Sequence, residues 1–316
     1  MNTPLIEATG LTKEYRLASG KKVHAVSDVS LQIFRGETLG LVGESGCGKS
    51  TLGRALIGLN PPTAGEVRFE GSPITGLGEK AFRAYRRRMQ MIFQDPYASL
   101  DPRMTVQEIV AEPLKTYRVC KTREALSARV GALLDAVGIP REYRDRYPHQ
   151  FSGGQRQRVG IARAIALDPD LIVCDEPVSA LDVSVQNQIL NLLKLLQRER
   201  GLTYLFISHD LSVVRFLADR VCVMFLGSLC ELGDTAGVYE NPLHPYTRFL
   251  LDAIPKPDPR TRGEERLLLS GDLPSPIDPP GGCRFHTRCP YATDRCRTEA
   301  PRLREVAGRL VACHRA

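Results

Sequence analysis

A run of small and charged residues, Gly43–Thr51, reads GESGCGKST and fits the pattern G-x-x-x-x-G-K-[ST]. It follows an apolar run at 38–42 and precedes a helical stretch at 52–59, which is the context that a phosphate-binding loop needs. Glycines let backbone N–H groups turn inward around phosphate oxygens, and the following helix points its positive end at the same anion. A chance glycine-rich turn is the alternative. The pattern predicts a nucleoside triphosphate site.

Two side chains of this loop would carry specific chemistry. Lys49 supplies a point charge for the β and γ phosphates, and the Ser50 hydroxyl can coordinate Mg²⁺. The whole loop is expected to contact ATP: Gly43, Glu44, Ser45, Gly46, Cys47, Gly48, Lys49, Ser50 and Thr51.

Two carboxylates end the apolar stretch LIVCDEP, which begins at Leu171. An acidic pair at the carboxyl end of a strand is where open α/β sheets place ligand chemistry. Asp175 would hold Mg²⁺, directly or through water, and Glu176 could polarise the attacking water as general base. The alternative is a pair of surface carboxylates that simply follow a strand.

A second device for binding anions is the turn Ser152-Gly153-Gly154-Gln155, which opens a helix. One nucleotide cannot easily use two such cradles from the same chain. We therefore expect this second cradle to close on the nucleotide of a partner subunit.

The elements that must position these residues alternate in a recognisable way. The first 40 residues predict several short, partly antiparallel strands, and 81–138 is helical and charged. After Ser152 a helix, a buried strand, a helix and a strand follow one another, which indicates an α/β protein with a mostly parallel sheet. The composition shifts near Asn241, and 255–266 has the character of a linker.

Bulk properties exclude some classes and leave others open. The chain has 316 residues, a net charge of +7 and 42% hydrophobic residues, with no apolar run of membrane-spanning length. Its first residues lack a basic region followed by an apolar run, which argues against secretion. The positive charge permits contact with nucleic acid or acidic lipid. Nine cysteines in such a chain favour free thiols or metal ligands.

Four of these cysteines crowd into the C-terminal segment: Cys283, Cys289, Cys296 and Cys313. Their spacing, C-x5-C-x6-C-x16-C, matches neither the tight pairs of structural zinc sites nor the run of bacterial ferredoxins. The spacing leaves open a metal site and four unrelated thiols. A metal would staple a segment too small to hold itself together, with His286 and His314 as possible substitute ligands.

The motif set, in its order and spacing, resembles an ABC-transporter ATP-binding subunit, in which two subunits sandwich two ATP molecules. The resemblance implies four further roles. Tyr15 would stack on adenine, Gln94 would sense the γ-phosphate and Mg²⁺, Asp182 would belong to the dimer-contacting loop, and His209 would be the switch histidine. Phe151 stands where leucine is commoner in the family. The implied catalytic residues are Lys49, Gln94, Glu176 and His209.

Further stretches resemble the oligopeptide/dipeptide importer branch, among them FQDPYASLDPRMTVQEI, RYPHQFSGGQRQR and NPLHPYTRFLLDAIP. The similarity is closest to the second ATPase of such systems, which pairs with a related, non-identical ATPase. It implies two permeases, an external binding protein reached indirectly, and a peripheral location on the cytoplasmic face of the inner membrane. The implied cofactors are ATP and Mg²⁺, with a [4Fe–4S] cluster, rather than Zn²⁺, on the four cysteines.

The resemblance also implies a fold: a RecA-like P-loop core with an N-terminal antiparallel β subdomain and a helical signature subdomain. We expect an ATPase domain at 1–240, its helical subdomain at about 95–160, and a cysteine-containing extension at 241–316.

Two other functions are compatible with an ABC ATPase. A soluble member acting on nucleic acid would suit the positive charge, but here the P-loop and the signature occur once each and lie close together. An exporter subunit is the other alternative, because ATPase motifs do not encode the direction of transport. The cargo, whether dipeptide, oligopeptide or another molecule, is chosen by subunits other than this one.

Overall fold

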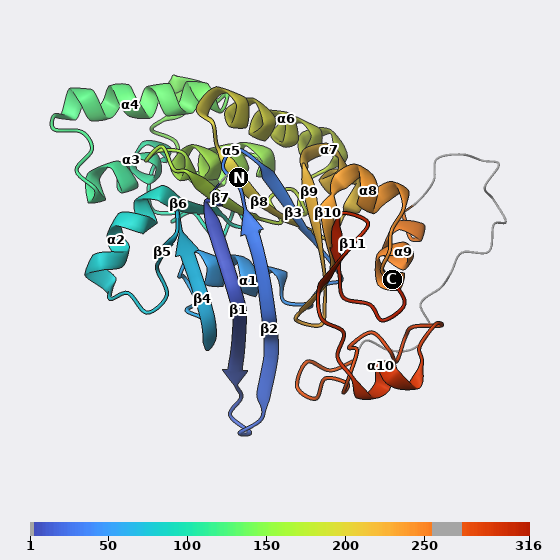
Figure 1. Cartoon of the computed structure of the whole chain (residues 1–316). Coiled ribbons are helices and arrows are strands. Elements are labelled where there is room, and N and C mark those ends of the chain that lie inside the picture. The colour runs from blue at the N-terminus through green and yellow to red at the C-terminus, as the bar shows by residue number, and fades with distance from the viewer. Residues whose placement is uncertain (1–2, 255–273) are drawn as a thin grey trace, which may run out of the picture. The chain divides into compact units, whose positions relative to one another are not determined.

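The computed structural model describes residues 3–254 and 274–316 (Figure 1). The chain forms two compact units, unit 1 (1–34, 38–75 and 208–316) and unit 2 (35–37 and 76–207). The predicted linker at 255–266 lies outside the described residues. The predicted division into 1–240 and 241–316 stays a prediction. No helix of the described residues is long and apolar enough to cross a membrane.

Unit 1 begins with an antiparallel sheet in the order β2-β1-β4-β5. Its strands are β1 (Ile6–Arg16), β2 (Lys22–Ile33), β4 (Ala64–Phe69) and β5 (Ser72–Pro73). The predicted antiparallel strands are present, but two long strands replace the several short ones. Register shifts between Ala8 and Leu11 carry β1 through Gly10, so its turn-like residues form an irregularity within one strand.

The other strands of unit 1 run in the order β11-β12-β10-β9-β3. They are β3 (Thr38–Val42), β9 (Arg220–Phe225), β10 (Ser228–Asp234), β11 (Arg304–Val306) and β12 (Arg309–Val311). Strand β3 is buried along its whole length and pairs in parallel with β9. A continuous apolar strand of this kind is covered on both faces.

The helices of unit 1 are α1 (Lys49–Leu56), α7 (Leu211–Leu217), α8 (Thr235–Glu240), α9 (Pro245–Asp252) and α10 (Asp294–Thr298). Helix α7 packs on β3, and α8 and α9 pack on β10. A Cβ on Gly40 of β3 would lie 2.4 Å from Cγ1 of Val214 in α7, so only glycine allows this approach.

Unit 2 contains parallel strands in the order β8-β7-β6, with the bounds Thr203–Ser208, Leu171–Asp175 and Met89–Ile92. The larger helices are α2 (Glu79–Arg88), α3 (Val106–Thr116), α4 (Arg123–Ala136), α5 (Gly153–Ala164) and α6 (Val183–Arg200), and the short turns are η1 (Arg141–Tyr143) and η2 (Pro148–Gln150). The predicted alternation of helix and strand after Ser152 is confirmed, and β7 and β8 are buried at every position.

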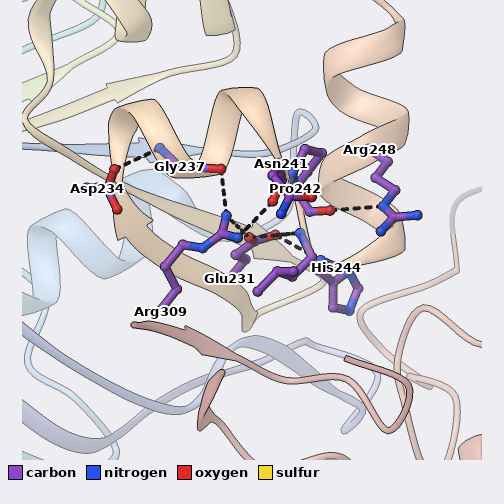
Figure 2. A network of polar contacts seen from close by, with 9 residues as sticks. Glu231, Asp234, Gly237, Asn241, Pro242, His244, Arg248 and Arg309 are labelled. Carbon is purple, nitrogen blue, oxygen red and sulfur yellow. Dashed lines mark hydrogen bonds and ion pairs between the residues drawn. The ribbon is translucent and has the colours of Figure 1, made fainter. Parts of the chain in front are cut away.

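A buried polar network fastens the C-terminal hairpin β11–β12 to the rest of unit 1 (Figure 2). Arg309 on β12 is 5% exposed, and its guanidinium lies 3.1 Å from the carboxylate of Glu231 on β10. It also donates to the main-chain oxygens of Gly237 and Asn241. The Glu231 carboxylate accepts the N–H groups of Leu243 and His244 as well. Both charges are therefore paired and hydrogen-bonded, as a buried ion pair requires.

Candidate nucleotide site

The predicted phosphate loop lies in unit 1 between β3 and α1, and two of its glycines are required by close contacts. Gly48 has φ 105°, and a Cβ there would lie 2.0 Å from the main-chain oxygen of Ala25. Gly43 has φ 155°, and its Cβ would lie 2.1 Å from the oxygen of Met224. Any side chain at either position would displace the loop backbone.

The N-terminus of α1 is suited to an anion. Gly48 caps the helix without a side-chain hydrogen bond, and among the described residues no acidic side chain belongs to its first turn. Lys49 is only 4% exposed, and its Nζ donates to the main-chain oxygens of Gly43 at 2.8 Å and Glu44 at 3.0 Å. A cation held by two neutral carbonyls at the positive end of a helix attracts phosphate oxygens.

Glu44, the second residue of the loop, is held from the C-terminal part of the chain. Its N–H donates to Tyr246 Oη at 2.9 Å, and its carboxylate accepts from Arg288 Nη1 at 3.1 and 2.8 Å. Sequence reasoning placed Glu44 in the loop but missed both partners. They lie 202 and 244 residues away in the chain, and no local pattern connects them with the loop.

Two other predicted contacts of ATP also lie in unit 1. Tyr15 is a half-buried residue of β1 whose hydroxyl accepts from Asn60, with Lys13 Nζ 5.2 Å from the centre of its ring. His209 is exposed in the turn after β8, next to Asp210, which caps α7. Unit 1 thus carries the loop, Tyr15 and His209.

Unit 2 brings together two of the predicted catalytic residues. Asp175 ends β7 and is 0% exposed, and Glu176 follows it with φ 46°. A non-glycine residue in this left-handed region is strained, and such strain is concentrated at functional sites. Gln94 Nε2 donates to Glu176 Oε2 at 3.0 Å, so the amide orients the carboxylate. The N–H of Glu176 donates to Ile207 O at 3.0 Å, which fixes the backbone.

The Ser-Gly-Gly turn has the predicted position at the start of α5. Ser152 is exposed and caps the helix in a reciprocal pair with Gln155. Gly154 is buried, and a Cβ there would lie 2.4 Å from Cγ1 of Val185 in α6. Phe151 is 4% exposed and packs edge-on against Tyr143, so the unusual aromatic residue fills an apolar position.

Asp182 is exposed and forms the N-cap of α6. Its Oδ1 accepts the N–H of Val185 at 3.0 Å and the hydroxyl of Ser184 at 2.7 Å. These hydrogen bonds, that from Val185 first, lower the pKa of the Asp182 carboxyl. The carboxylate is therefore kept charged at the surface of unit 2.

Comparison with known proteins identifies the family. Residues 26–179 match the ABC transporter family, and 230–296 match the family described as oligopeptide/dipeptide transporter, C-terminal region. Over 313 residues the chain is 54% identical to a putative oligopeptide transport ATP-binding protein of Bacillus subtilis, which covers 98% of this chain and 95% of the relative. Over 318 residues it is 51% identical to the oligopeptide transport ATP-binding protein OppF of Escherichia coli, with 98% and 95% covered. The chain belongs to the ABC transporter ATP-binding proteins, in their oligopeptide/dipeptide branch.

The fold agrees with this ABC ATPase family. An ATP-binding cassette solved as a dimer in a post-hydrolysis state with ADP and Pi is 32% identical, with a TM-score of 0.67 over 73% of this chain and 98% of that one. The predicted ABC ATPase fold is confirmed. ATP and Mg²⁺ are the cofactors expected of an ABC ATPase. The alternative of an ATPase acting on nucleic acid has no support among the relatives.

The predicted iron–sulfur or zinc site is not supported. The four cysteines do converge, because all of them line one cavity of about 20 Å³. Among the described residues, however, no three His, Cys, Asp or Glu side chains are arranged to hold a metal ion. His286 and His314 also line this cavity, and each bonds a main-chain oxygen through one ring nitrogen, His286 to Cys283 O and His314 to Glu299 O.

The cavity is small, and the thiols that line it are buried or half-buried. The cavity of about 20 Å³ has room for roughly one water molecule between these side chains. Burial raises the pKa of the Cys283 thiol to about 11, so this thiol is protonated when no metal is bound. None of the nine cysteines, all of which lie within the described residues, forms a disulfide.

Proposed function

We propose that this ABC ATPase energises the import of di- or oligopeptides across the cytoplasmic membrane. The observation that carries the proposal is the match of 230–296 to the oligopeptide/dipeptide transporter C-terminal region, joined in one chain to a complete ATPase motif set. ATPase motifs alone do not distinguish cargo, whereas this C-terminal region is described by its transport system. Relatives with 52% identity carry the name putative peptide import ATP-binding protein, which favours import over export.

In the proposed reaction the phosphate loop binds ATP through Lys49 and the amides of α1, and Tyr15 stacks on adenine. Glu176 accepts a proton from the attacking water, and the hydrogen bond from Gln94 supports its orientation. His209 is the switch histidine that lies near the γ-phosphate. Bound Mg²⁺ would supply charge neutralisation, with Ser50, Gln94 and Asp175 as its proposed neighbours.

We further propose a partner of the same kind, a paralogous ATPase subunit. Ser152 and Asp182 are exposed helix caps of unit 2, a state that suits contact with a second chain. Gly153, Gly154 and Gln155 would complete the cradle for the partner's ATP. Two permeases would contact the segment 95–109, and an external binding protein would deliver the cargo. The subunit would then be peripheral, on the cytoplasmic face of the membrane.

The test is reconstitution with the permeases and the paired ATPase in lipid vesicles. ATP hydrolysis should rise several-fold when the binding protein is added with a peptide ligand. Glu176→Gln should bind ATP but lose at least about a hundredfold of turnover, because the general base is absent. Hydrolysis that no peptide stimulates would refute peptide import while leaving the ATPase assignment intact.

A further inference from the structure

The C-terminal extension contacts the phosphate loop at Glu44, and nothing in the family motifs accounts for this contact. Glu44 Oε1 and Oε2 lie 3.1 and 2.8 Å from Arg288 Nη1, and Glu44 N lies 2.9 Å from Tyr246 Oη. The main-chain oxygen of the same residue accepts from Lys49 Nζ at 3.0 Å and from Cys47 N at 3.3 Å. Glu44 therefore connects the extension directly with the lysine expected to bind phosphate.

Arg288 is held firmly enough to position its partner. Its side chain is 8% exposed, against 27% for that of Glu44. Hydrogen bonds between neighbouring turns, His286 N to Cys283 O and Arg288 N to Phe285 O, fold the segment 283–289 tightly. A buried guanidinium on such a frame has little freedom to follow the loop, so the loop must follow it.

Phe285 anchors this segment. It is 2% exposed, and its ring lies 5.3 Å from the rings of Phe225 and Tyr246 and 6.0 Å from that of Phe249. Tyr246 lies 4.7 Å from Phe225 as well. Tyr246 belongs to this aromatic cluster, and Arg288 follows its member Phe285 by three residues, so the cluster supports both groups that hold Glu44.

We propose that Arg288 and Tyr246 are positioning residues of the nucleotide site, through which the C-terminal extension keeps the phosphate loop in its ATP-binding conformation. This inference rests on the proposed ATP site. Arg288 fixes the side chain of Glu44, and Tyr246 fixes its N–H. Together they hold the carbonyl oxygen that receives Lys49. Neither residue touches the reacting atoms.

The experiment measures MgATP binding by calorimetry and steady-state hydrolysis on the full-length chain. Arg288→Ala should weaken ATP binding and raise KM about tenfold, with kcat within about twofold, because a charge-assisted hydrogen bond is lost from the binding conformation. Tyr246→Phe should weaken binding about threefold, since it removes one hydroxyl and keeps the ring. Arg288→Lys should recover part of the affinity.

Two comparisons separate positioning from mere attachment of the extension. Glu44→Gln and Arg288→Ala combined should weaken binding no more than either alone, because both act through one contact. Arg295→Ala, which removes an exposed ion pair with Glu299 in the same extension, should leave ATP affinity unchanged. Variants at Arg288 and Tyr246 that lose stability but bind ATP as the native chain does would overturn the inference. A native chain that fails to bind ATP would instead refute the proposed function.

Discussion

Two buried cations in unit 1, Lys49 of the phosphate loop and Arg309 of the C-terminal hairpin, are held in opposite ways. Arg309 pairs with the fully buried carboxylate of Glu231 and donates to two further main-chain oxygens. Lys49 is buried to the same degree, at 4% against 5%, but donates to two neutral carbonyls of its own loop. A charge already neutralised by protein serves structure, whereas one held by weak dipoles is poised for an anionic ligand.

The two regions also differ in how their contacts are encoded. The phosphate loop is built from consecutive residues, and its glycines allow main-chain approaches that a Cβ would block. The hairpin is fastened by a pair 78 residues apart in the sequence, and no residue near Arg309 indicates its partner. The loop is thus a local device and the hairpin a tertiary one.

The largest effect is expected from breaking the loop with Gly48→Ala. The new Cβ would lie 2.0 Å from Ala25 O at a φ of 105°, so the backbone that surrounds the phosphates must move. We expect ATP binding to fall at least about a hundredfold in calorimetric titration. Gly20→Ala is the control, because it has φ 80° with nothing within 4 Å, and it should cost about 1 kcal/mol of stability with no loss of affinity. Equal ATP affinity in both variants would contradict the role of Gly48.

Breaking the hairpin anchor with Arg309→Leu should be next in size. The change leaves Glu231 buried without its cation, and removing one partner of a buried pair costs about 3–5 kcal/mol. Urea unfolding should show this loss, and limited proteolysis should begin in the C-terminal hairpin. Replacing Glu231 as well should not restore stability, since its carboxylate also accepts the N–H groups of Leu243 and His244. Full recovery in the double variant would show that the pair acts alone.

His244, near the hairpin anchor, should make the stability of the protein depend on pH. Burial lowers the pKa of His244 to about 4, and its Nδ1 accepts the N–H of Tyr246. In the unfolded chain the histidine pKa is about 6.5. Between about pH 6.5 and about pH 4 the histidine is therefore protonated in the unfolded chain and neutral in the folded chain. Stability should therefore fall by about 3 kcal/mol as pH drops from about 6.5 to 4.

The matched variant for this prediction is His244→Asn, whose side-chain oxygen can still accept the N–H of Tyr246. Denaturant titrations at several pH values should show a flatter pH profile for the variant than for the native chain. If the stability of the variant depended on pH as steeply as that of the native chain, the acid sensitivity would belong to other groups.

The sequence predicted the local parts of this protein well. The loop, the carboxylate pair after β7 and the cap at Ser152 were all predicted, because each depends on residues adjacent in the chain. The sequence predicted short strands where the structure has the long strand β1. Gly10 resembles a turn residue in the sequence, but in the sheet it lies at an irregularity within one strand. Arg288 and Tyr246 were missed because only the folded chain brings them to Glu44.

The spacing of the four cysteines does not decide whether they hold a metal, and Cys289→Ser tests this question with the smallest expected effect. All four line one cavity, but among the described residues no three His, Cys, Asp or Glu side chains are arranged to hold a metal ion. A serine there exchanges a half-buried thiol for a hydroxyl of similar shape, so stability should change by less than about 1 kcal/mol and ATP affinity should stay the same. Absorbance near ~400 nm in anaerobically purified native protein, lost in the variant together with the protection of the extension from proteolysis, would instead restore the iron–sulfur cluster. Because Arg288 adjoins Cys289, a variant that also weakened ATP binding would show that the cysteine segment and the phosphate loop are coupled.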